Sequence, residues 1–197
     1  MARLVLGIGV SHTPMLNGEV EDWVRFAEVD RKRALLDRDG NNTTFDTLLN
    51  AAGDTLLPHI KAEAMQARHA AAMANLDRIR AALHAAKLDA LIVVGDDQNE
   101  LIDERNSPCF LIYRGATIPN VPFDGNIDRP DWWRKLAARY YEPSTPRDYP
   151  VDASLADHLI DRLIEREFDV ACANSVPPGK GEGHAFGFVH NRLLEGD

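Results

Sequence analysis

The sequence predicts an α/β fold, with three α/β/α layers around a mainly parallel or mixed sheet. Short apolar, β-branched segments alternate with longer segments in which apolar residues recur at helical spacing, and this alternation is typical of such a sheet. The chain has 197 residues, of which 45% are hydrophobic and 27% charged. This length and composition suit one soluble domain with a buried core, so residues 1–197 are expected to form a single domain.

The N-terminal part is predicted to contain one strand and two surface helices. Residues 3–10 are apolar and read as a strand that Pro14 prevents from continuing. Residues 21–36 and 44–52 can form helices. The sequence Asp39-Gly40-Asn41-Asn42 between them is a strong turn signal.

The middle of the chain is predicted to form one long helix followed by two strands. Residues 58–86 are rich in alanine, start with a proline suited to a first helical turn, and carry an apolar stripe at helical spacing. Residues 90–94 and 108–113 are short apolar segments that read as strands.

The C-terminal part is predicted to be irregular at first and then to alternate again. Residues 118–151 are rich in proline, aspartate and aromatic residues, and are expected to be irregular. Residues 154–167 should form a helix with Ser154 as its N-cap, and residues 168–173 a strand. Residues 184–194 should begin a last helix.

Charge and hydropathy exclude some classes of function. The formal net charge of −9 argues against a broad nucleic-acid-binding face, which needs clustered Lys and Arg. No apolar run approaches the roughly 20 residues that span a bilayer, and the N-terminus lacks the features of a signal peptide. We therefore expect a cytoplasmic protein without nucleic-acid or membrane partners. Cys109 and Cys172 lie in apolar segments and are expected to be buried, reduced thiols.

Candidate functional residues follow the predicted strands. In parallel α/β sheets, ligands bind beyond the carboxyl ends of strands. His12 follows the first predicted strand, Asp96 and Asp97 follow the second, and residues 174–184 follow the last. This convergence predicts a site.

Three of the seven histidines stand out by position. His12 lies at a strand end, His59 at a predicted helix start, and His184 after a glycine-rich loop. The first two suit metal ligation and the third suits proton transfer, although position alone leaves structural roles open for all three. Structural or surface roles are expected for the others, which lie within predicted helices: His69, His84, His158 and His190.

The chain resembles the class III extradiol ring-cleavage dioxygenases, specifically their LigB-type catalytic subunits. The resemblance runs in order along nearly the whole chain. It is carried by the segments GIGVSHTPML at 7–16, EDW at 21–23 through TFDTL at 44–48, LPH at 57–59, VVGDDQNE at 93–100 and GEGHAFGFV at 181–189.

The resemblance implies an iron-dependent activity. His12 and His59 would bind Fe(II), a catecholic aromatic of the protocatechuate or gallate type would chelate the metal, and O₂ would take a remaining position. His184 would serve as base and then as acid, and Thr13 is expected to contact the substrate. The two atoms of O₂ would be inserted as the ring opens.

The third iron ligand of this family is a glutamate well downstream of the acid–base histidine, and no residue matches it here. We expect a sheet that is incomplete at the C-terminus. The alternatives are a fragment, a second polypeptide that supplies the rest, or a substitute carboxylate such as Asp97, Glu100 or Glu182. Exposed apolar surface on an incomplete sheet predicts a homo-oligomer or a partner subunit.

Two other functions compete with the dioxygenase. The chain could be a catalytically incomplete homologue that acts as an assembly or aromatic-binding protein. A zinc- or iron-dependent hydrolase could use the same histidines.

Overall fold

The structure is a computed structural model that describes residues 3–194. These residues form two compact units, one comprising Ile8–Ala82 and the other comprising residues 3–7 together with residues 83–194. Helices account for 44% of the chain and strands for 9%, which confirms the mixed α/β class and an incomplete sheet. The predicted single domain stays a prediction, and the two units are described separately.

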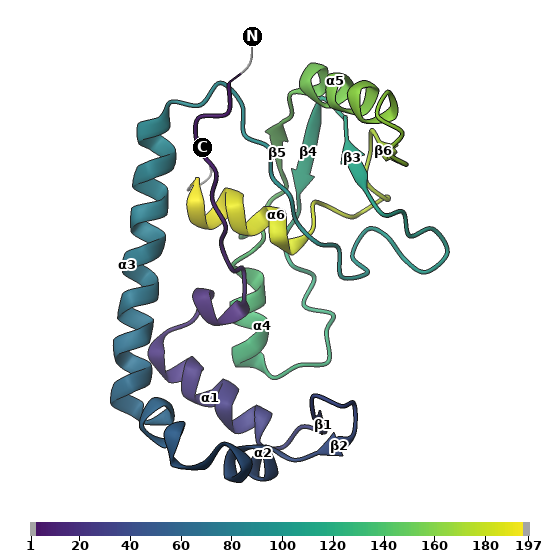
Figure 1. The fold of residues 1–197 in the computed structure, drawn as a ribbon. Coiled ribbons are helices and arrows are strands. Elements are labelled where there is room, and N and C mark those ends of the chain that lie inside the picture. Colours follow the sequence, from purple (N-terminus) through teal and green to yellow (C-terminus); the bar gives the residue numbers. More distant parts are fainter. Residues whose placement is uncertain (1–2, 195–197) are drawn as a thin grey trace. The chain divides into compact units, whose positions relative to one another are not determined.

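The Ile8–Ala82 unit is mostly helical (Figure 1). It also contains short 3-10 turns at Pro14–Asn17, Gly53–Thr55 and Leu57–Ile60. Its helices are α1 (Val20–Asp30), α2 (Phe45–Ala52) and the long α3 (Ala62–Ala86), and α3 runs past the boundary of the unit. Its two strands, β1 (Leu35–Leu36) and β2 (Asn42–Thr43), pair antiparallel.

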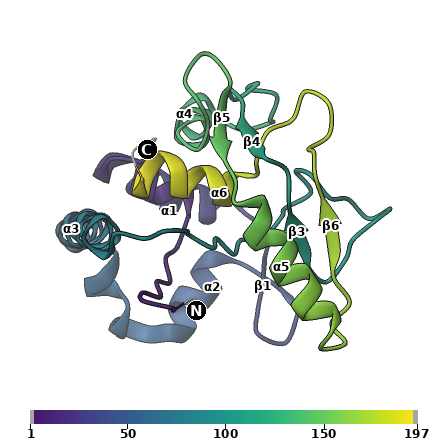
Figure 2. The same cartoon turned by 90° about the horizontal axis from the view of Figure 1, so that it is seen from above.

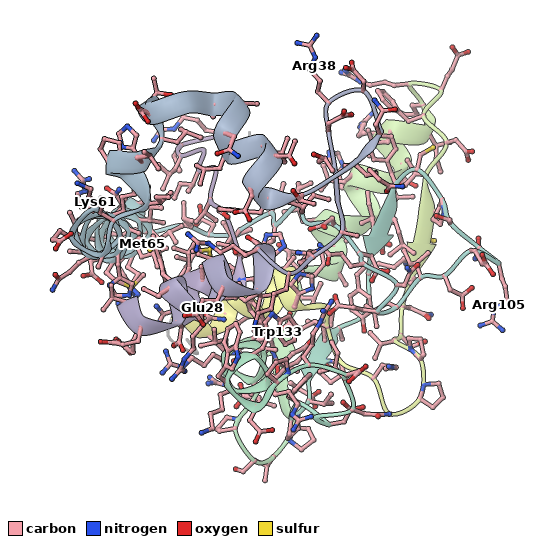
Figure 3. All side chains as sticks on the ribbon, turned by 90° about the horizontal axis from the view of Figure 1, so that it is seen from below. Glu28, Arg38, Lys61, Met65, Arg105 and Trp133 are labelled. Carbon is pink, nitrogen blue, oxygen red and sulfur yellow. The ribbon has the colours of Figure 1, made fainter. Side chains whose placement is uncertain are left out.

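Local sequence explains the ends of these helices. The side chains of Glu19 and Asp22 form a reciprocal capping box that starts α1. The Thr44 hydroxyl accepts a hydrogen bond from the Thr47 backbone N–H and caps α2, which begins one residue after its predicted start. The predicted turn at residues 39–42 lies in the connection between β1 and β2, and Arg38 projects from the same connection (Figure 3).

His69 ties α3 to the turn before α1. Its Nε2 lies 2.9 Å from the Gly18 carbonyl oxygen, and its ring meets the Trp23 ring edge-on at 5.4 Å. The Trp23 indole N–H donates to the Met15 carbonyl at 2.8 Å. The structural role expected for His69 is therefore confirmed.

The second unit holds the remaining strands. Strand β3 (Leu111–Tyr113) pairs parallel with β6 (Ala171–Ala173), and β4 (Thr117–Asn120) pairs antiparallel with β5 (Arg147–Pro150). Helix α5 (Ala153–Ile164) packs beside β3 (Figure 2). The unit also contains α4 (Asp131–Ala138), and α6 (His184–Phe188) runs directly into a π-helical turn at Val189–Leu193.

The core of this unit is built mainly from its helices and β5. The core residues are buried to at least nine-tenths: Leu136, Ala137, Tyr140, Tyr149, Ala156, Ile160, Ala185, Phe188 and Leu193. The loop at 103–107 lies outside this core, and Arg105 points away from the ribbon there (Figure 3). Among the described residues, no helix combines the length and the apolar character needed to cross a bilayer.

Two predicted strands do not form ladders. Residues 3–10 and 90–94 lack the backbone pairing of a strand, although their composition favours it. Leu4 is 90% exposed and Val94 is 92% exposed. Strand propensity measures how well a side chain fits a half-buried sheet. A segment with high propensity forms a hydrogen-bonded ladder only where a partner strand is present.

The prediction of an irregular segment at 118–151 is wrong. This segment contains α4, β5 and most of β4. Pro119 and Pro150 concealed the two strands, and both are tolerated because β4 and β5 form a two-stranded sheet in which each strand has an edge.

The cysteine prediction is correct in one respect only. Cys109 and Cys172 are free of disulfides, but both are exposed. Cys172 lies in β6, whose one described ladder partner is β3, so the sheet is too narrow to cover it.

Candidate acid–base site

His184 is the first residue of α6, and a carboxylate from a distant loop holds it. The backbone N–H of His184 donates to Glu100 Oε2 at 3.0 Å, and its ring Nδ1 lies 2.8 Å from the same oxygen. Gly183, the N-cap residue, has no side chain to cap the helix. Glu100 therefore takes over the capping of α6 and orients the imidazole at once.

Glu100 is itself held in place at both ends. The Asp97 carboxylate accepts hydrogen bonds from the backbone N–H groups of Glu100, Leu101 and Ile102 at 3.2, 3.0 and 3.1 Å. At the other end, the Tyr141 hydroxyl donates to Glu100 Oε1 at 3.0 Å. The carboxylate thus has one oxygen on Tyr141 and the other on His184.

The two partners shift each other's proton affinity. Burial opposes ionisation of Glu100, but the hydrogen bond and the positive charge of His184 outweigh it and lower the pKa of this carboxyl group. The hydrogen bond to Glu100 raises the pKa of His184 against the opposing effect of burial, and the negative charges of Glu100, Asp96 and Asp97 raise it further. The imidazole therefore binds a proton more firmly than an unperturbed histidine side chain does.

Aromatic rings form the surroundings of this pair. The edge of the Tyr140 ring meets His184 at 5.4 Å between centroids, and Tyr141 stacks on Phe123 at 5.6 Å. Burial raises the pKa of both tyrosines well above the ordinary value. The tyrosine hydroxyls therefore act as neutral donors.

Close approach explains the glycine at position 183. A Cβ there would lie 2.7 Å from Glu100 Oε2, nearer than real Cβ atoms come to such a neighbour. At position 181, a Cβ would lie 2.7 Å from the Pro119 carbonyl oxygen, and the neighbouring Glu182 N–H donates to that oxygen, also at 2.7 Å. The glycine-rich loop is thus pressed against β4 and Glu100.

A second imidazole–carboxylate pair lies beside the first. Glu182 is 2% exposed, and its two carboxylate oxygens lie 2.8 and 2.9 Å from His190 Nδ1. The Asn120 amide donates to Glu182 Oε1 at 2.7 Å. His190 stacks face to face on Tyr149 at 3.9 Å. No local pattern in the sequence indicates this pair, because His190 lies within a predicted helix.

The other predicted site residues lie in the Ile8–Ala82 unit. His12 and Thr13 immediately precede the 3-10 turn Pro14–Asn17, and the Thr13 carbonyl accepts from the Leu16 N–H at 2.9 Å. His59 is exposed and lies in the 3-10 turn Leu57–Ile60. The predicted helix start at Pro58 is therefore wrong, since α3 begins at Ala62.

The described residues do not complete a three-ligand metal site. Within residues 3–194, no three His, Cys, Asp or Glu side chains come together in a way that could hold a metal. The carboxylates considered as substitute ligands are engaged elsewhere: Asp97 with three backbone N–H groups, Glu100 with His184 and Tyr141, and Glu182 with His190 and Asn120. Among residues 3–194, the expected Fe(II) ligands are therefore only the two imidazoles of His12 and His59.

Arginines that could recognise a substrate carboxylate already have partners. Arg114 Nε lies 3.0 Å from Asp157 Oδ1, and the Arg129 guanidinium lies over the Trp133 ring.

Comparisons of this chain with protein-family models, with curated proteins and with solved structures found no match.

Proposed function

We propose that the chain is part of a non-haem Fe(II)-dependent extradiol dioxygenase that opens the ring of a catecholic aromatic with O₂, and that His184 is its acid–base residue. One observation carries the proposal. The imidazole of His184, which directly follows the glycine-rich loop, is hydrogen-bonded to the half-buried carboxylate of Glu100. A histidine oriented in this way is suited to take a proton from a hydroxyl group and to return it later.

Individual residues of the chain would have separate roles in the reaction. His12 and His59 would supply two imidazole ligands for the metal, whose chemistry when bound is to bring substrate and oxygen together. His184 would accept the proton of a substrate hydroxyl at Nε2 and later return it to an oxygen atom that is retained in the ring-opened product. Glu100 stabilises the imidazolium formed in between, because it already carries the opposite charge 2.8 Å away.

The test is turnover by the full chain. The protein is loaded with Fe(II) without oxygen and then given protocatechuate, gallate and catechol in turn, while O₂ uptake and the yellow ring-opened product are followed. His184→Ala should abolish turnover and leave bound iron unchanged, whereas His12→Ala should remove iron. His158→Ala, an exposed histidine on α5, is the matched control and should change neither.

Two results would overturn the proposal. One is the absence of O₂ uptake with every member of the panel, and the other is turnover that survives His184→Ala. The first would favour a catalytically incomplete homologue that binds aromatics or assembles with a partner. That candidate has one specific support, namely that Glu100 and Glu182 already bind other groups in the fold.

A further inference from the structure

We propose that Glu100 is a positioning residue for His184, which holds the imidazole as the Nδ1–H tautomer and so makes Nε2 the nitrogen that exchanges a proton. The catalytic meaning of this assignment rests on the proposed function. The assignment of the tautomer itself does not, because it concerns the protein without substrate or metal.

The contacts of one carboxylate oxygen fix the direction of the ring. Glu100 Oε2 accepts from the backbone N–H of His184 at 3.0 Å and lies 2.8 Å from Nδ1 of the same residue. A carboxylate oxygen only accepts hydrogen bonds, so Nδ1 must carry the proton. In the neutral ring the lone pair then belongs to Nε2, on the opposite side of the imidazole.

The carboxylate cannot turn away easily, since its other oxygen is also occupied. Tyr141 donates to Oε1 at 3.0 Å, and Tyr141 is in turn stacked on Phe123. Asp97 fixes the backbone from which the Glu100 side chain extends. The absence of a Cβ at Gly183 leaves the room in which Oε2 lies. Four separate features thus converge on one orientation of His184.

The charged and titratable groups around His184 act in the same direction. Glu100, Asp96 and Asp97 are the acidic groups that interact with the ring, and Tyr140 meets it with a ring edge. The Glu100 contact is the largest of the effects that raise the pKa of His184. Its removal should therefore lower that pKa more than the removal of any single neighbour.

The experiment observes the ring nitrogens directly. In the full chain labelled with ¹⁵N-histidine, two-dimensional NMR of the metal-free protein should show His184 as the Nδ1–H tautomer, with a pKa above the ordinary value. Glu100→Gln keeps an acceptor but loses the charge, so the tautomer should persist while the pKa falls. Glu100→Ala removes the acceptor, and the signals should move toward a mixture of tautomers. Glu104→Gln, in the same loop and exposed, should leave His184 unchanged.

Turnover provides the second readout. Glu100→Gln should lower kcat by at least about tenfold, a part of the roughly 10²–10⁴-fold that a positioned acid–base group contributes, with little change in KM. An Nε2–H tautomer in the unaltered protein, or a His184 pKa that does not move in Glu100→Gln, would refute the assignment. If Glu100→Gln fails to fold, Glu100→Asp gives the same test, because its side chain is one methylene shorter, so the carboxylate moves away from Nδ1 and the His184 pKa should also fall. Lack of turnover with every catechol would refute only the proposed function.

Discussion

The buried carboxylate of Glu182 provides a stringent test of how the C-terminal turn is held. Glu182→Ala removes both oxygens that face His190 Nδ1 and the acceptor of the Asn120 amide. The Asn120 amide keeps a second hydrogen-bond acceptor, the Tyr140 carbonyl at 3.2 Å, but His190 loses the carboxylate that faces its Nδ1.

The size of the effect follows from burial and charge. Hydrogen bonds to a charged group are worth about 1.5–3 kcal/mol each, and the Glu182 carboxylate has two partners, His190 Nδ1 and the Asn120 amide. The Glu182 side chain is 1% exposed, so water cannot replace these bonds. Glu182→Ala should therefore lower the free energy of unfolding by about 3–5 kcal/mol. Glu182→Gln, which keeps one acceptor without the charge, should cost about half as much.

Equilibrium unfolding in urea, followed by tryptophan fluorescence and circular dichroism, measures this loss. The matched control is Glu165→Gln, which breaks an ion pair to Arg162 whose two side chains are each 60% exposed. Such surface pairs are worth roughly 0–1 kcal/mol. A loss below about 1 kcal/mol for Glu182→Ala, similar to that of Glu165→Gln, would refute the view that this buried pair stabilises the unit.

Three further predictions concern close packing, pH and association. Gly187→Ala should destabilise the protein by about 1–3 kcal/mol in urea, because its Cβ would overlap the Tyr140 carbonyl, which cannot move without losing its donors. The pKa of His184 is raised above 6.5 and that of Glu100 is lowered below 4.5. Their mutual stabilisation, measured as the difference in unfolding free energy between the unaltered protein and Glu100→Gln, should be full between pH 4.5 and 6.5. It should be lost as the pH rises through the folded pKa of His184 or falls through that of Glu100. Size-exclusion chromatography with light scattering should show an oligomer, and Val94→Lys should shift it toward monomer, because Val94 is 92% exposed.

Each of these three predictions can be contradicted by a specific measurement. A Gly187→Ala variant as stable as the parent would mean that the backbone yields at that point. A Glu100→Gln difference that does not change with pH would mean that the pair contributes no charge-dependent stability. A monomer at all concentrations would remove the reason for expecting self-association.

Local sequence signals predicted the elements that depend on local physics. The long helix and the β3 and β6 strands lie within the predicted segments, because helical spacing and short apolar runs are local properties. Helix α5 begins one residue before its predicted segment, and Asp152 caps it instead of the predicted Ser154. Residues 3–10 and 90–94 were predicted as strands from the same kind of signal, but a ladder depends on a distant partner that their composition does not specify.

In the candidate site, too, local sequence indicates one residue but not its distant partners. His184 stood out because of the glycine-rich loop before it, whereas its partner Glu100 lies 84 residues earlier in the chain. The sequence indicates Glu100 only as a candidate substitute metal ligand, since a carboxylate in a loop gives no sign of which distant side chain it meets. Tyr141 lay in a segment expected to be irregular, so nothing singled it out. The predicted roles of His12, His59 and Thr13 remain predictions.

The stack of His190 on Tyr149 gives the protein a built-in reporter. The two rings are parallel to within 1° and their centroids lie 3.9 Å apart, while the Arg147 guanidinium lies 4.9 Å from the Tyr149 ring centre. The imidazole protons of His190 therefore lie in the shielding region of the phenol ring, and their proton resonances should be shifted upfield. If the C-terminal turn lifts from β5, this ring-current shift should disappear, so an ordinary one-dimensional spectrum can follow the docking of α6 without a ligand, metal or label.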